Sequence, residues 1–153
     1  MELQDFIEFD EIYFNEYPSW GEAPATVWGL NENTVFEVKV EHDNPYELMN
    51  EFAVYGVTGK AILAIRGWGA PINPDEDVEK HIRPSLHPNR MRLALYMYFD
   101  EDSEKIVVAV HEEGKDLMVM GDESTGALAE VAYECINQVK DVITNLKEIE
   151  AEA

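Results

Sequence analysis

The sequence predicts an α+β domain in which an antiparallel sheet of about five or six strands is covered on one face by a short helix and a long C-terminal helix. Apolar or alternating segments predict strands at residues 34–41, 60–66, 91–99, 105–111 and 116–120. The last three strands are joined by short polar connections, which is typical of antiparallel hairpins. Apolar residues at helical spacing near the C-terminus predict a long helix over residues 125–150.

The predicted strands differ in how much of their surface is expected to be buried. Residues 34–41 alternate apolar and charged side chains, which predicts a strand buried on one face only. Residues 60–66 are apolar nearly throughout and predict a central strand. Residues 18–29 contain two prolines and two glycines, so we expect a loop there. The whole chain, residues 1–153, is expected to form a single domain.

Two helices are predicted. A short helix is predicted over residues 45–55. Its start is favoured because Asn44 can cap it, Pro45 suits the first helical position and Glu47 suits a capping box. The long helix carries apolar residues at alternating intervals of four and three: Leu128, Ala132, Cys135, Val139, Val142, Leu146 and Ile149. This stripe predicts a helix that covers the sheet, and its regular spacing also permits a homodimer through residues 128–149.

The charge is uneven along the chain. The net charge is −21, with −12 in residues 1–51, +2 in residues 52–99 and −11 in residues 100–153. Such a field repels nucleic acid and anionic membranes and attracts basic protein surfaces, so direct nucleic-acid binding and membrane binding are not expected. Adaptation to high salt would also give an acidic chain. At 46% hydrophobic residues the protein is expected to fold despite its charge.

The single cysteine, Cys135, excludes an internal disulfide and is typical of a reducing cytosol. No segment has the length and apolar character of a membrane span, and the N-terminus lacks the basic start of a signal peptide. The expected location is the cytoplasm, which would be the host cytoplasm if the protein is encoded by a phage.

The N-terminal arm, residues 1–24, mixes aromatic and acidic residues. It is expected either to pack on the domain as an edge strand or arm, or to dock on a partner. In the second case the rings would anchor in the partner while the carboxylates steer it into place. The candidate partner-binding residues are Phe6, Glu8, Phe9, Asp10, Glu11, Tyr13, Phe14, Glu16, Tyr17 and Trp20.

Residues 80–92 form the basic segment of the chain. Guanidinium and imidazole groups are suited to binding an anion or a phosphate, and a tryptophan between two glycines leaves room for a close approach. The alternative is that these bases neutralise surrounding carboxylates and that the tryptophan plugs the end of the sheet. The candidate anion-binding residues are Trp68, Arg83, His87, Arg90 and Arg92.

No catalytic residues, cofactor or metal site are predicted. The acidic residues of 75–79 and His81 match no metal-ligand spacing and predict a solvated turn. Ser85 and Ser124 lie in no nucleophile elbow, and Cys135 falls on the apolar stripe of the long helix. His111 is interpreted as isolated. An enzyme is therefore not favoured.

The motif Gly67-Trp68-x-Ala70-Pro71, followed by Arg83-Pro84-Ser85-x-His87-Pro88-x-Arg90-x-Arg92, resembles uncharacterised acidic proteins of actinobacteria and their phages. The resemblance covers roughly residues 45–130. Gly69 stands where that family usually has alanine, and the N-terminal arm and the C-terminal helix are not part of its pattern. The resemblance implies an actinobacterial or phage setting and no particular chemistry.

Together these features predict a non-enzymatic acidic interaction protein that binds a basic surface of a host protein or of a nucleic-acid enzyme, as an inhibitor or a nucleic-acid mimic. One alternative is a domain that binds a small molecule, a nucleotide or phosphate through residues 80–92. Another is a structural homo-oligomer that assembles through the C-terminal helix.

Overall fold

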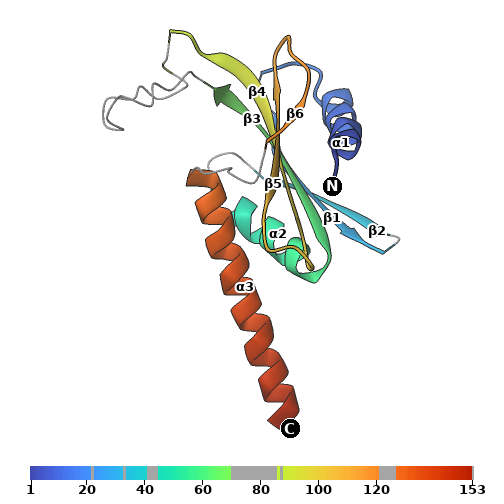
Figure 1. The fold of residues 1–153 in the computed structure, drawn as a ribbon, viewed down its shortest axis with the longest axis vertical. Coiled ribbons are helices and arrows are strands. Elements are labelled where there is room, and N and C mark those ends of the chain that lie inside the picture. The colour runs from blue at the N-terminus through green and yellow to red at the C-terminus, as the bar shows by residue number, and fades with distance from the viewer. Residues whose placement is uncertain are drawn as a thin grey trace.

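The computed structural model (Figure 1) describes residues 1–21, 23–32, 34–40, 45–69, 86, 88–120 and 127–152. In chain order its elements are α1 (Leu3–Glu16), β1 (Ala25–Asn31), β2 (Thr34–Val40), α2 (Pro45–Thr58), β3 (Lys60–Gly69), β4 (Met91–Asp100), β5 (Val107–Glu112), β6 (Met118–Val119) and α3 (Ala127–Glu152). The six strands form one sheet in the order β2-β1-β3-β4-β5-β6, with antiparallel neighbours throughout. The predicted α+β class is confirmed.

One face of the sheet is covered by α2 and α3, as predicted. Phe52 of α2 and Ile136 of α3 are buried there together with Leu63 of β3 and Phe99 of β4. Because α2 lies between the sheet and much of α3, the long helix touches the domain mainly through its N-terminal half (Figure 1). The rest of α3 extends away from the other elements.

The opposite face is covered by α1, so the N-terminal arm packs on the domain, as one of the two expectations had it, but as a helix and not as an edge strand. Phe6 and Tyr13 lie two helical turns apart on the same side of α1, and both are fully buried against this face of the sheet. Helix formation is supported by a capping box, in which the Asp5 carboxylate accepts the Glu2 N–H at 3.0 Å. The alternation of aromatic and acidic residues therefore reflects a helical stripe, and both faces of the sheet are covered.

Two strands differ from the prediction. Residues 25–31, expected as part of a loop, form β1 between β2 and β3. Gly29 permits this arrangement, because a Cβ at this position would lie 2.4 Å from the Tyr55 ring. The strand expected at residues 116–120 is reduced to the two residues of β6.

Candidate functional site

The aromatic residues of α1 form a layer between this helix and the sheet. The Tyr13 ring packs edge-on against Trp28 and Tyr96, with centroid separations of 6.1 Å and 6.2 Å. The Tyr13 hydroxyl donates a hydrogen bond to the Pro24 carbonyl oxygen at 2.9 Å. Phe9 lies 5.4 Å from Trp28 between ring centroids. Much of the aromatic content of the N-terminal arm therefore fixes α1 in place.

The predicted partner-binding residues consequently fall into two groups. Phe6, Asp10 and Tyr13 are buried, so a partner cannot touch them while α1 is docked on the sheet. The other members are at least partly accessible: Glu8, Phe9, Glu11, Phe14, Glu16, Tyr17 and Trp20. The Glu16 carboxylate in this group already pairs with the Lys39 ammonium of β2.

A polar cluster joins α1 to β4 and β5. The buried Asp10 carboxylate accepts the Tyr96 hydroxyl, and its two oxygens lie 3.0 Å and 2.9 Å from Nδ1 of His111. Burial, followed by the hydrogen bond to Asp10, raises the pKa of Tyr96. This corrects the interpretation of His111 as isolated. Its partner is 101 positions away in the chain, so no local spacing pattern could reveal the pair.

A shallow cleft opens beside this cluster. It has a volume of about 460 Å³ and is lined by Asp10, Glu11, Phe14, Asn15, Trp20 and His111. The His111 ring lies 5.6 Å from Phe14 and 5.0 Å from Trp20 between centroids, and these two rings are 4.7 Å from each other, so the three rings form one contiguous aromatic group. This cleft brings candidate residues of the N-terminal arm together with His111, which no sequence pattern had indicated as part of a site.

Arg66 of β3 secures the chain where α1 ends. Its guanidinium donates hydrogen bonds to the carbonyl oxygens of Tyr17 and Ser19, and its Cζ lies 4.1 Å from the Phe14 ring centroid. A helix C-terminus favours a cation, because its last carbonyl oxygens lack helical partners. Burial lowers the pKa of Arg66, but an arginine remains charged at neutral pH. Arg66 therefore stabilises the turn that follows α1.

Three of the predicted anion-binding residues lie together at the end of the sheet. Trp68 of β3 pairs across the strands with Arg92 of β4, whose Cζ is 4.2 Å from the Trp68 ring centroid. The Arg90 Cζ lies 4.9 Å from the same centroid. Arg92 also donates a hydrogen bond to the Trp20 carbonyl oxygen at 3.1 Å. The structure thus brings Trp68, Arg90 and Arg92 together, whereas the predicted Arg83 and His87 lie outside the described residues.

The acidic turn at residues 75–79, with Lys80, His81 and Ser85, also lies outside the described residues. Within the described ranges, no group of three or more His, Cys, Asp or Glu side chains is placed to hold a metal ion. The same part of the chain contains no helix that is long and apolar enough to cross a membrane.

The fold and these clusters define an α+β domain with one antiparallel sheet between helical layers. No family model matches the chain, and no curated protein or solved structure shows a significant similarity to it.

Proposed function

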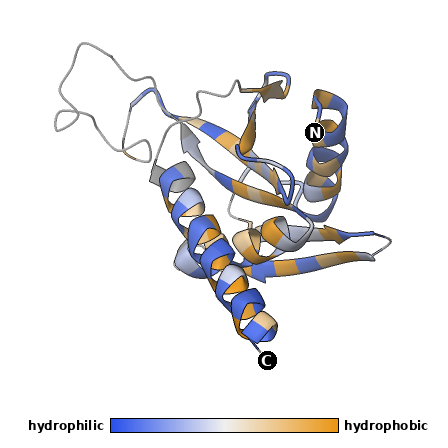
Figure 2. Ribbon diagram, turned by 60° about the horizontal axis from the view of Figure 1, so that its bottom comes forward, coloured by the Kyte–Doolittle hydropathy of each residue, from blue (hydrophilic) through white to orange (hydrophobic). Residues whose placement is uncertain are grey.

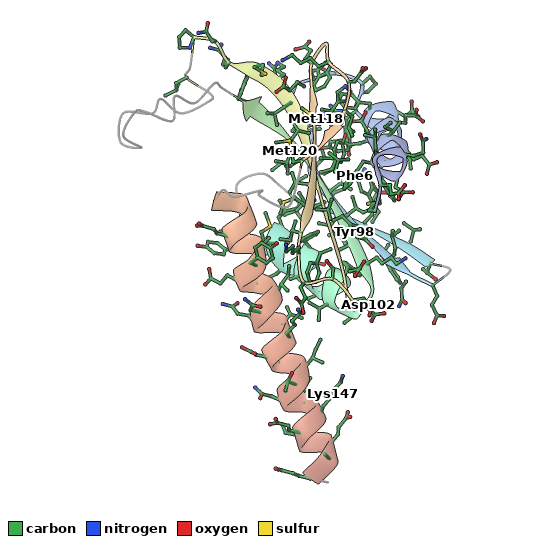
Figure 3. All side chains as sticks on the ribbon, in the orientation of Figure 1. Phe6, Tyr98, Asp102, Met118, Met120 and Lys147 are labelled. Atoms are coloured by element: carbon green, nitrogen blue, oxygen red, sulfur yellow. The ribbon has the colours of Figure 1, made fainter. Side chains whose placement is uncertain are left out.

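We propose that this protein is a non-enzymatic acidic interaction protein that docks on a basic surface of a host protein or nucleic-acid enzyme, as an inhibitor or nucleic-acid mimic. The observation that supports this proposal is the placement of the carboxylates. Of the described Asp and Glu side chains, Asp10 alone is buried, so the excess negative charge lies at the surface. Side chains ending in oxygen project from α1 on the side away from the sheet (Figure 3).

The outer surface of α1 is the most suitable docking surface. Glu8 and Glu11 are exposed and lie one helical turn apart, while Leu3 and Ile12 on the same helix remain 46% and 49% exposed. The buried aromatic layer docks the helix on the sheet, so the backbone that carries the carboxylates is already ordered when a partner binds. Carboxylates would then guide association, and the aliphatic side chains would add contact area.

Partner capture from an actinobacterial lysate tests this proposal. Glu8→Gln combined with Glu11→Gln is expected to reduce partner retention about tenfold, because two steering charges are lost at the docking surface. The control, Glu148→Gln combined with Glu150→Gln, makes the same charge change on α3 and should retain the partner.

Retention should also fall from about 0.1 M to about 0.5 M salt, because the screening length shortens. Retention that is insensitive to salt, or equal in the two double variants, would contradict the proposal.

A second candidate function is anion binding by Trp68, Arg90 and Arg92. It is favoured by the two guanidinium groups within 5 Å of one indole ring, the nearer at 4.2 Å and the other at 4.9 Å. Phosphate or nucleotides should then raise the melting temperature. Arg90→Ala combined with Arg92→Ala should abolish that shift, while Lys115→Ala combined with Lys147→Ala should preserve it. An unchanged melting temperature with every anion would reject this candidate.

The cytoplasmic location and the actinobacterial or phage setting stay predictions. The homodimer predicted through residues 128–149 also stays a prediction. Because Ala132, Cys135 and Ile136 are buried inside the domain, a dimer could use only the C-terminal part of this stretch.

A further inference from the structure

The apolar stripe of α3 changes its surroundings halfway along the helix. Ala132 and Cys135 are 0% and 5% exposed, because they pack against the domain. Val142, Leu146 and Ile149 continue the same stripe but are 57%, 55% and 62% exposed. Figure 2 shows hydrophobic residues recurring along α3 toward its C-terminal end. We call these three residues, together with the partly buried Val139, the distal stripe.

We propose that the distal stripe is covered by the distal stripe of a second copy of this chain, with the two α3 helices antiparallel. The stripe is continuous with an interface that the helix already forms inside its own domain, and the spacing of four and three residues persists. A helical segment that projects alone into water is only marginally stable, so a partner helix would stabilise residues 140–152. This goes beyond the proposed docking on a basic partner.

The spacing sets the register of the antiparallel pair. If Val142 lies opposite Leu146 of the second copy, then Val139 lies opposite its Ile149, and the apolar residues form consecutive layers. A parallel pair would gather Glu148, Glu150 and Glu152 of both copies at one end. In the antiparallel register these carboxylates lie at opposite ends of the pair, so the repulsion between them is smaller.

The charge of the whole chain favours the same direction. Each copy carries a net charge of −21, whereas residues 140–152 contain four acids and two bases. A parallel pair would place the two strongly negative domains side by side. In the antiparallel register the domains are separated by about ten residues of helix, or about 15 Å along the axis. That distance exceeds the screening length of about 8 Å at physiological salt.

Sedimentation equilibrium of the full chain over a concentration series tests the dimer. We expect a monomer–dimer equilibrium that strengthens from about 0.1 M to about 0.5 M salt, because salt screens the repulsion between two negative chains. Val142→Asp combined with Leu146→Asp should raise the dissociation constant at least about a hundredfold. Thr144→Asp combined with Ala151→Asp adds the same charge outside the stripe and should still dimerise.

A monomeric wild-type protein at all concentrations, or equal dissociation constants for the two double variants, would overturn the dimer. Docking on a basic partner should weaken with salt, so the two proposals fail in separate experiments. Cysteine cross-linking tests the direction, in a Cys135→Ala background. Val142→Cys mixed with Leu146→Cys should form a mixed disulfide, whereas disulfides between two copies of the same variant would overturn the antiparallel arrangement.

Discussion

Phe6→Ala is expected to lower the free energy of unfolding by about 3–5 kcal/mol, because a fully buried ring would be replaced by a cavity. Phe6 packs into the cluster that joins α1 to the sheet, together with Tyr13, Trp28 and Tyr96. Its loss should therefore loosen α1 and expose the aromatic face of the sheet. Urea denaturation measures the change.

Ile12→Ala is the matched control for that experiment. Ile12 lies on the same helix but is 49% exposed, so its truncation should cost less than about 1 kcal/mol. Equal effects of the two substitutions would mean that α1 is not docked on the sheet through Phe6.

Stability is expected to fall steeply as the pH rises above about 10. Burial raises the pKa of Tyr13 to about 12, and burial is also the main cause of the raised pKa values of Tyr96 and Tyr98. Because these values lie above the unfolded value of about 10, the tyrosines contribute their full stability below that pH. The contribution is lost as the pH rises toward the folded values. The expected slope approaches about 1.4 kcal/mol per pH unit for a tyrosine that stays protonated in the folded protein while the unfolded chain ionises.

Denaturation midpoints measured across this pH range test the expectation. Tyr96→Phe should remove about a third of the slope, because one of three titrating hydroxyls is lost. Tyr46→Phe changes a side chain that is 65% exposed and should leave the slope intact. A stability that is constant between pH 10 and 12 would contradict the buried positions of these hydroxyls.

Most of the fold follows from local patterns in the sequence. The hairpin connections predicted β4 and β5, the apolar run predicted β3, and the stripe of four and three residues predicted α3. The strand β1 escaped prediction because Gly29 was interpreted as a loop residue, whereas it makes room for the Tyr55 ring. Propensity alone cannot distinguish these uses of glycine, since the ring comes from another element.

The helix α1 escaped prediction for a related reason. Its inner face is interrupted by Asp10, which weakens the apolar stripe that would indicate a helix. The carboxylate is tolerated there because Tyr96 and His111 supply hydrogen-bond partners from 86 and 101 positions away. Trp68 and Arg92 were both named as candidate anion-binding residues, but the predicted strand 60–66 ended before Trp68. Their contact arises because β3 continues to Gly69 and pairs with β4 over this extension.

The proposed docking surface requires α1 to be an integral layer of the domain, because this position fixes its exposed carboxylates. Amide hydrogen exchange of α1 tests this position. We predict that the amides of residues 7–16 exchange as slowly as those of β4, because both elements belong to one cooperative core. Exchange of these amides at the rate of a free chain, while β4 stays protected, would contradict it.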